Sequence, residues 1–254
     1  MFHLLGLQLD VPNYTRLSRR GTVPLITRQL EKMDEPGHLV IDSTGIKVFG
    51  KFVLASHLRN NAQILRIVMR VPGSMSRGSA ISAQEIMKLG TLIRKDGKII
   101  PISEAQPAKF DFGTGAVSCL PLSFGDLITA WHSTDIPMFV DVTGAAFPEG
   151  DVLELPDGPG EDEKASNPAK VLAEVTASDG FKSYAVMETL NGYSYTPLSA
   201  VEAVRQVLDG KFKPGFQTLV TVFGPDFAFT IPHTRLITVI TKVEKELNSQ
   251  NPPC

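Results

Sequence analysis

The fold class is decided by the stretch Val171-Leu-Ala-Glu-Val-Thr-Ala-Ser-Asp-Gly-Phe-Lys-Ser-Tyr-Ala-Val-Met-Glu-Thr-Leu190. It contains two runs, residues 171–177 and 181–190, that are rich in the residue types common in strands. Asp179-Gly180 lies between them, and an Asp-Gly pair favours a tight turn because glycine accepts a positive φ. The stretch therefore predicts an antiparallel β-hairpin.

Working outward, the same turn chemistry recurs in Leu92-Ile-Arg-Lys-Asp-Gly-Lys-Ile-Ile-Pro-Ile102, which predicts a second hairpin. Apolar patterning predicts a further hairpin at residues 38–50, strands at 63–71, 109–112, 117–122 and 138–142, and helices at 52–58, 79–89, 124–131 and 197–208. We therefore expect an α+β fold, with a mostly antiparallel (mixed) sheet, helices packed on it and no complete Rossmann domain.

Two segments lack this regular pattern. Residues 147–168 combine glycine, proline and acidic residues without apolar periodicity, which predicts a mobile, exposed loop. Residues 237–247 have an amphipathic pattern, interpreted as a terminal helix or a frayed end. The expected organisation is an N-terminal segment at 1–50, an α+β domain at 51–233 and a tail at 234–254.

Composition limits the possible functions. The 25 basic and 27 acidic residues give a formal charge of −2, which argues against a general role in binding nucleic acid. The two cysteines, Cys119 and Cys254, are too far apart in sequence for a zinc motif and predict a reducing, cytoplasmic environment. No apolar run approaches the roughly 20 residues that span a bilayer, and we expect neither a membrane span nor a signal peptide.

A glycine-rich turn precedes the predicted helix at 79–89. In Pro72-Gly-Ser-Met-Ser-Arg-Gly-Ser79, the backbone amides at a helix start, together with Ser76, Arg77 and Ser79, form a candidate site for an anion or substrate. The lysine of a nucleotide-binding P-loop is missing. The alternative is that the serines only cap the helix, with Ser79 as the cap.

A second glycine motif, Gly113-Thr-Gly115, resembles the start of a dinucleotide-binding turn but precedes a predicted strand. Such a turn holds a pyrophosphate only where its amides open a helix. The motif is therefore interpreted as a link between two strands, and we expect this chain to bind no cofactor.

Two further places carry candidate chemistry. Trp131-His-Ser-Thr134 follows a predicted helix, which makes His132 and Ser133 catalytic candidates in the lining of a pocket. The alternative is that these residues only pack a helix end. Asp42 follows an apolar strand, where it is either a metal-binding carboxylate or a turn residue before Ser-Thr-Gly.

The N-terminal segment resembles the DDE transposases of insertion sequences. The resemblance rests on Val11-Pro-Asn-Tyr-Thr-Arg-Leu-Ser-Arg-Arg20 and on His38-Leu-Val-Ile-Asp-Ser-Thr-Gly-Ile-Lys-Val-Phe-Gly50. It implies that Asp42 corresponds to the first metal-binding carboxylate of that family. Because the resemblance ends near Gly50, Asp42 is expected to be an isolated remnant.

Residues 52–232 are similar to the C-terminal part of saccharopine dehydrogenase-like oxidoreductases, the group of the trans-acting enoyl reductases. The motifs that carry this resemblance are Ala55-Ser-His-Leu58, Ser76-Arg-Gly-Ser-Ala80, Asp111-Phe-Gly113, Ala130-Trp-His-Ser-Thr-Asp-Ile-Pro137, Leu198-Ser-Ala-Val-Glu-Ala203, Pro214-Gly-Phe-Gln-Thr218 and Phe223-Gly-Pro-Asp-Phe227. The resemblance implies an α+β domain that shapes a substrate site and a dimer interface, next to a Rossmann domain that holds NAD(P) in the intact family.

Together the two resemblances suggest a chimera. The resulting hypothesis is a truncated oxidoreductase without its cofactor half, inactive alone, that binds a hydrophobic small-molecule substrate and forms a homodimer through the C-terminal sheet. One alternative is a transposase-derived DNA-binding fragment, although DNA is not the expected partner. The other is a dimerisation module without a ligand.

Overall fold

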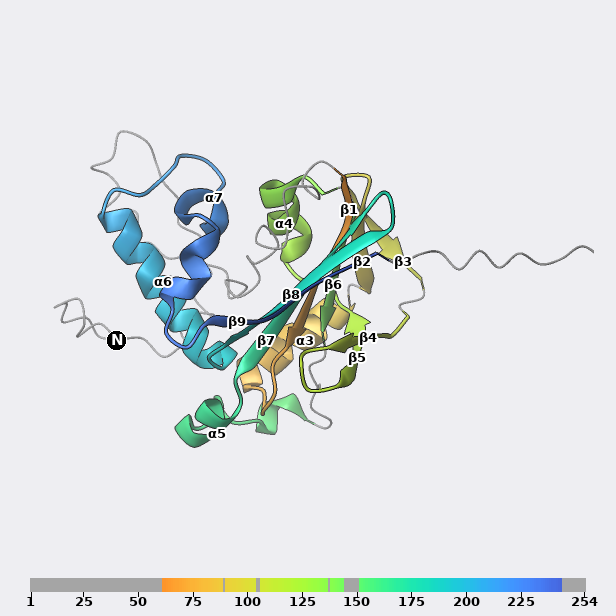
Figure 1. Ribbon diagram of the computed structural model, residues 1–254. Helices are drawn as coiled ribbons and strands as arrows, with labels where there is room; N and C mark the ends of the chain where they lie inside the picture. The colour runs from red at the N-terminus through yellow and green to blue at the C-terminus, as the bar shows by residue number, and fades with distance from the viewer. Residues whose placement is uncertain (1–60, 89, 104–105, 137, 144–150, 244–254) are drawn as a thin grey trace, which may run out of the picture. The chain divides into compact units, whose positions relative to one another are not determined.

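The computed structural model describes residues 61–88, 90–103, 106–136, 138–143 and 151–243 (Figure 1). The predicted hairpin at 38–50, the predicted helix at 52–58 and Asp42 lie outside these residues. The strands are β1 (Ala62–Arg70), β2 (Thr91–Lys95), β3 (Lys98–Ile102), β4 (Ala108–Asp111), β5 (Ala116–Pro121), β6 (Met138–Thr143), β7 (Ala169–Ala177), β8 (Phe181–Thr189) and β9 (Arg235–Val243).

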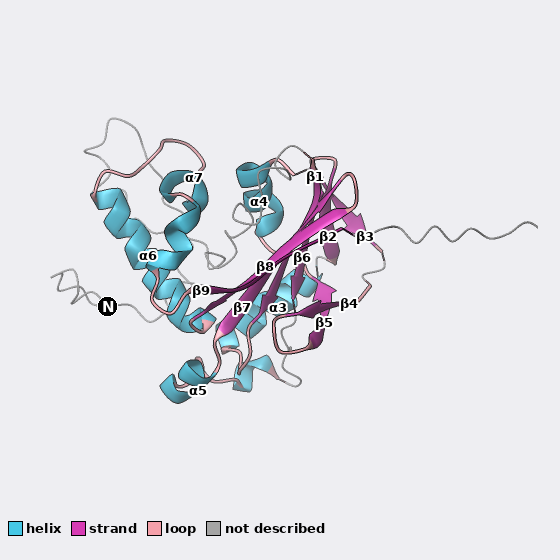
Figure 2. Ribbon diagram, viewed as in Figure 1, coloured by secondary structure: helices cyan, strands magenta, loops and turns pink. Residues whose placement is uncertain are grey.

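The strands form one mixed sheet. Its main path runs β3-β2-β6-β1-β7-β8-β9, and β5 connects β4 to β6. The β1–β6 pair is parallel, and the other pairs in the described part of the chain are antiparallel. The α+β fold with a mostly antiparallel sheet is therefore confirmed (Figure 2).

Both Asp-Gly hairpins are confirmed. In the turn between β2 and β3, Asp96 and Gly97 have φ of 50° and 72°, the left-handed pair that this turn requires. A Cβ on Gly97 would lie 3.3 Å from the ring of Trp131, so glycine also permits a close approach to that ring. The turn between β7 and β8 has Gly180 at φ 78°.

The helical segments are α3 (Arg77–Lys88), α4 (Asp126–Thr134), η3 (Val152–Glu154), α5 (Glu161–Ser166), α6 (Gly192–Leu208), α7 (Leu219–Phe223) and η4 (Pro225–Thr230). The predicted helices at 79–89 and 124–131 correspond to α3 and α4. The predicted start of α6 at Pro197 is wrong, because Asn191 caps the helix by accepting a hydrogen bond from the Tyr193 amide. Gly210 follows the end of α6 at φ 85°, as expected.

The predicted terminal helix at 237–247 is wrong over its described part. Residues Arg235–Val243 form β9, which pairs with β8 from Arg235 opposite Glu188 to Val243 opposite Phe181. The sequence Ile-Thr-Val-Ile-Thr suits a strand at least as well as a helix, because β-branched residues pack well on a pleated surface. Pairing with β8 decides between the two conformations.

The segment at 147–168 was predicted to be a mobile, exposed loop. None of its described residues is buried, but the prediction of a loop is wrong over η3 and α5. It contains η3 and α5, with Asp151 accepting a hydrogen bond from the Leu153 amide and capping η3. The first turn of α5 carries Glu161, Asp162 and Glu163, whose negative charges stabilise the positive end of the helix dipole. The acidic residues of this segment therefore favour the start of a helix.

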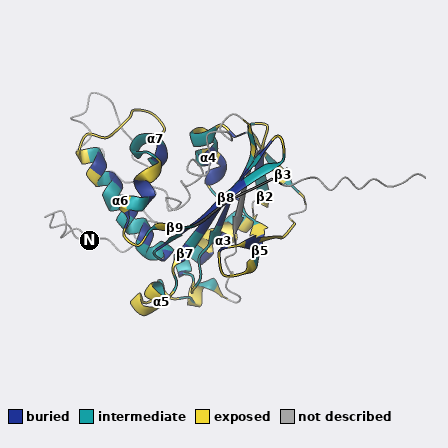
Figure 3. Cartoon of the chain, viewed as in Figure 1, coloured by how far each residue is buried: buried dark blue, intermediate teal, exposed yellow. Residues whose placement is uncertain are grey.

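Buried residues are concentrated in the strands of the sheet and in the helices beside it (Figure 3), and they form one core on each face of the sheet. On the helix-covered face, β1, β7 and β8 pack against α4, α6 and η4 through a core that consists of Leu65, Ile67, Leu127, Ala130, Ile136, Val171, Ala173, Val175, Ala185, Met187, Tyr195, Ala228 and Ile231. On the hairpin face, the same strands pack against the β4–β5 hairpin through Val68, Phe110, Phe112, Cys119, Leu172 and Val186.

Candidate functional site

The end of α4 meets the segment that leads into α7. The hydroxyl oxygens of Ser133 and Thr218 are 2.8 Å apart. The rings of His132 and Phe216 have centroids 4.8 Å apart with an interplanar angle of 82°, an edge-to-face contact. The structure thus brings together residues that are more than eighty positions apart in sequence.

These residues form a partly apolar surface, which we call the α4 patch: Ile128, His132, Ser133, Phe216 and Thr218. Ile128 and His132 are separated by one helical turn and share a side of α4. The side chains of Ile128 and Phe216 are 53% and 56% exposed. The α4 patch therefore presents apolar groups to solvent beside the part-buried pair of Ser133 and Thr218 hydroxyls.

The hydrogen bonds of the α4 patch favour binding over acid–base chemistry. The Ser133 hydroxyl donates to the Thr129 carbonyl at 2.8 Å, so its proton does not point to His132. Thr218 caps α7 in a capping box with Thr221. A nucleophile needs its proton directed at a base. The prediction that His132 packs a helix end agrees with its contact to Phe216.

At the predicted anion site, the polar groups at the start of α3 form hydrogen bonds with other groups of the protein. Ser76 Oγ accepts a hydrogen bond from the Ser79 amide at 3.2 Å, so Ser76 is the helix cap and the assignment of Ser79 as the cap is wrong. The Tyr193 hydroxyl accepts from the Ser76 amide at 2.7 Å and donates to Ser79 Oγ at 3.0 Å. This tyrosine, which sequence reasoning missed, fastens α6 to the start of α3.

Arg77 faces the segment at 151–168. Its Nε donates to the Leu155 carbonyl at 3.0 Å, its Nη2 lies 3.2 Å from a carboxylate oxygen of Asp157, and its amide donates to the Pro156 carbonyl at 2.9 Å. An anion at Arg77 would compete with these contacts. The guanidinium therefore anchors a segment that was expected to be mobile.

A second anchor holds the same segment. Glu163 on α5 accepts a hydrogen bond from the Ser74 amide at 2.6 Å, and this bond lowers the pKa of the Glu163 carboxyl from its ordinary value of 4.5. A Cβ on Gly73 would lie 3.2 Å from the same carboxylate. The glycine-rich turn at 72–78 therefore serves as a docking place for α5.

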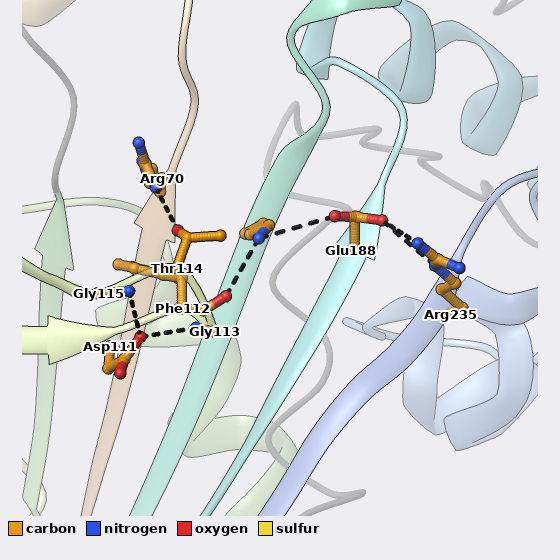
Figure 4. A network of polar contacts seen from close by, with 9 residues as sticks. Arg70, Asp111, Phe112, Gly113, Thr114, Gly115, Glu188 and Arg235 are labelled. Atoms are coloured by element: carbon orange, nitrogen blue, oxygen red, sulfur yellow. Dashed lines mark hydrogen bonds and ion pairs between the residues drawn. The ribbon is translucent and has the colours of Figure 1, made fainter.

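The turn at 111–115 closes the β4–β5 hairpin, as predicted for a link between strands (Figure 4). Asp111 Oδ1 accepts hydrogen bonds from the amides of Gly113 and Gly115, at 2.8 and 3.0 Å. Those amides are thus bound to a carboxylate of the same turn. They do not open a helix toward a pyrophosphate, which a dinucleotide-binding turn requires.

The same turn lies over a row of charged residues on the hairpin face. Arg70, Lys170, Glu188 and Arg235 are register partners across β1, β7, β8 and β9. Glu188 lies between two cations, since Lys170 Nζ is 3.8 Å away and Arg235 Nη2 is 2.8 Å away. Figure 4 shows the contact of Glu188 with Arg235. Lys170 also donates to the Phe112 carbonyl, and Arg70 to Thr114. We call these four residues the charged row.

A pocket of about 340 Å³ lies beside the charged row. Its lining residues come from α5 and the segment after it, from the end of β8 and the segment after it, and from the segment before β9: Lys164, Ala165, Pro168, Glu188, Thr189, Leu190, Asn191 and His233. The pocket contains none of the site residues predicted from the sequence. Neither it nor the charged row had a local signal, because β-strand pairing creates both.

Residues 1–51 match the family model of the transposase DDE domain. This match agrees with the resemblance of the N-terminal segment to DDE transposases. A comparison with curated proteins gives no match. Asp42 belongs to the matched segment, and its metal-binding role stays a prediction.

Two searches of the described residues complete the inventory of sites. Within those ranges no helix is long and apolar enough to cross a membrane. Among the same residues, no three His, Cys, Asp or Glu side chains gather in a group that would suit a metal ion.

Proposed function

We propose that residues 61–243 are the substrate-binding part of a saccharopine dehydrogenase-like oxidoreductase, similar to the enoyl reductases. In this proposal the domain binds a hydrophobic carbonyl or enoyl compound and, without a cofactor domain, does not reduce it. The N-terminal segment, which matches a transposase model, replaces the Rossmann half. The intact family would use NAD(P), whereas this chain would not.

The α4 patch is the observation that carries the proposal. Two of the motifs behind the resemblance, residues 130–137 and 214–218, meet there through His132–Phe216 and Ser133–Thr218. Exposed Ile128 and Phe216 suit the acyl chain of a hydrophobic carbonyl or enoyl compound.

The two glycine-rich turns, at 72–78 and 111–115, support the part of the proposal that this chain does not bind NAD(P)H and so does not reduce the ligand. The amides of Gly113 and Gly115 are held by Asp111, and the start of α3 is capped by Ser76 and joined to Tyr193. Pyrophosphate binding would need free amides at a helix start. We therefore expect no saturable binding of NADH or NADPH at micromolar concentration.

Ligand binding tests the proposal directly. A fluorescent apolar probe displaced by a 2-dodecenoyl thioester reports affinity in the purified full chain. Ile128→Ser and Phe216→Ser should each weaken thioester binding several-fold, because each removes apolar contact area. Met87→Ser is the matched control, since Met87 is 54% exposed on α3, away from the α4 patch. Equal affinity in all variants, or NADPH-dependent reduction of the thioester, would overturn the proposal.

The dimer in this proposal would form at β9. Its centre, Leu236-Ile-Thr-Val-Ile-Thr241, carries no charge and no proline, and β9 is an edge of the sheet path. The other edge, β3, is shorter and contains Lys98 and Pro101, which discourage pairing. An edge strand whose centre carries no charge is a template for a second copy.

Sedimentation tests the dimer. We expect a dimer that becomes monomeric in Ile240→Lys, whose position pairs with Tyr184 of β8. Ile99→Lys on β3 is the control and should leave the dimer intact. A monomeric parent chain would remove the dimer from the proposal.

The match at residues 1–51 favours a second candidate, a transposase-derived DNA-binding fragment. Its basic residues include Arg16, Arg19, Arg20 and Arg28. A gel-shift assay on duplex DNA would support this candidate if binding fell steeply with salt and vanished when these arginines became glutamine. Binding to a thioester with no DNA shift would favour the first proposal.

A further inference from the structure

The loop between α6 and α7 exposes large apolar side chains. Leu208, Phe212 and Phe216 are 76%, 58% and 56% exposed, and they lie within nine positions of one another. Single exposed apolar residues are ordinary on protein surfaces, whereas a cluster marks an interaction site. We call residues 208–217 the apolar loop (Figure 1).

The apolar loop has a defined shape and projects from the domain. Gly210 and Gly215 have φ of 85° and 83°, and a Cβ built on either would meet no other atom within 4 Å. The Lys211 amide donates to the Gln206 carbonyl, and Gln217 Nε2 donates to the Pro214 carbonyl. A projecting loop offers no groove that could receive a side chain of a partner protein. Its exposed side chains can instead insert between lipid headgroups.

Basic side chains flank the central aromatic ring. Lys211 and Lys213 are the neighbours of Phe212 in sequence, and their ammonium groups are held at the base of the loop by Gln206 Oε1 and the Thr221 carbonyl. The acid of this segment, Asp209, is already paired with Arg205 at 2.6 Å. Arg205 also pairs with Glu202, and Lys211 interacts electrostatically with that glutamate, so residues 202–213 carry a net charge of +1. The loop thus combines apolar tips with a small excess of positive charge behind them.

We propose that the apolar loop docks the protein on a membrane surface that contains anionic lipids. In this arrangement Leu208, Phe212 and Phe216 enter the boundary between headgroups and acyl chains, and Lys211 and Lys213 stay at the headgroup level. Aromatic and basic residues are the types suited to these two depths. Leu208 and Phe212 are not part of the α4 patch, so the inference goes beyond the proposed function.

Vesicle flotation of the full chain tests the inference. We expect binding to vesicles of phosphatidylcholine mixed with phosphatidylglycerol, and weaker binding to phosphatidylcholine alone. The double variant Leu208→Ser/Phe212→Ser should bind the mixed vesicles about tenfold more weakly, since it removes two inserted side chains. Lys211→Glu/Lys213→Glu should abolish the preference for the anionic lipid. Met87→Ser/Leu153→Ser, which removes exposed apolar groups elsewhere, should bind like the parent chain.

Three results would overturn the inference. The first is that the parent chain does not float with mixed vesicles, and the second is that both serine double variants float equally. The third is that Leu208→Ser/Phe212→Ser changes the oligomeric state without lipid, which would make the loop a contact between copies. Leu208→Ser/Phe212→Ser should keep its affinity for the thioester. Failure of thioester binding with intact vesicle binding would therefore count only against the proposed function.

Discussion

The two faces of the sheet use the same strands but are stabilised differently. The helix-covered face buries a continuous apolar core under α4, α6 and η4. The hairpin face buries a smaller cluster under β4 and β5 and surrounds it with the charged row and the Arg66–Glu174 ion pair, which is 2.6 Å long. Apolar burial dominates the first face, whereas the second combines packing with polar contacts.

This difference follows from alternation along the strands. Successive side chains point to opposite faces, so Leu65 and Ile67 enter one core while Val68 enters the other. A slip of one residue would place Arg66 and Glu174 under the helices, where burying charge is costly. The charges of the hairpin face therefore help to fix the register.

The largest effect is expected on the helix-covered face. Leu65→Ala should lower the free energy of unfolding by about 4 kcal/mol, near the upper end for a buried leucine, because close-packed neighbours on both sides prevent collapse of the cavity. Urea denaturation monitored by circular dichroism measures the loss. A change below about 1 kcal/mol would contradict the packing of this core.

A matched change probes the hairpin face. Leu172→Ala should cost about 2 kcal/mol, less than Leu65→Ala, because partly exposed Val117, Tyr184 and Ile237 border the smaller cluster and can relax into the cavity. Urea denaturation again gives the value. Equal losses of unfolding free energy in Leu65→Ala and Leu172→Ala would contradict the difference in packing between the two faces.

Thiol labelling separates the faces further. Burial raises the pKa of the Cys119 thiol in the hairpin-face cluster, so the thiol is protonated and slow to react at neutral pH. In a Cys254→Ser background, Leu172→Ala should accelerate labelling of Cys119 under native conditions more than Leu65→Ala does. The reverse order would show that Cys119 becomes accessible through opening of the helix-covered face.

A smaller effect is expected from the charged row. Glu188→Gln should destabilise the protein by about 1 kcal/mol, because Lys170 and Arg235 lose their shared carboxylate while remaining partly hydrated. Thermal unfolding at low and high salt measures the change. Glu85→Gln on α3, which breaks a solvent-exposed pair with Lys88, is the control and should have no measurable effect.

The smallest effect is local and depends on pH. The hydrogen bond from Ser74 lowers the pKa of Glu163, so this contact stabilises the fold above the ordinary pKa of 4.5 and is lost as the pH falls through the lowered value. The Ser74 amide resonance should titrate with a midpoint below 4.5. Glu163→Ala should remove the titration and speed proteolysis of residues 151–168, whereas Glu161→Ala should preserve both. A midpoint above 4.5 would contradict the contact.

The sequence by itself determined the elements whose preference is local. The Asp96-Gly97 and Asp179-Gly180 turns require positive φ values that few residues accept, so both hairpins could be predicted. The link at 113–115 was predicted because a strand follows it. The residues of the α4 patch were named in part, since His132 and Ser133 stand out beside the single tryptophan.

Only the tertiary structure decided how these elements combine. The pattern from Arg235 to Val243 suits both a helix and a strand, and pairing with β8 selects the strand. The contact of His132 with Phe216, the anchoring of α5 through Glu163 and the alignment of the charged row join residues far apart in sequence. Such contacts depend on which strands become neighbours, and a one-dimensional pattern of local preferences does not contain that information.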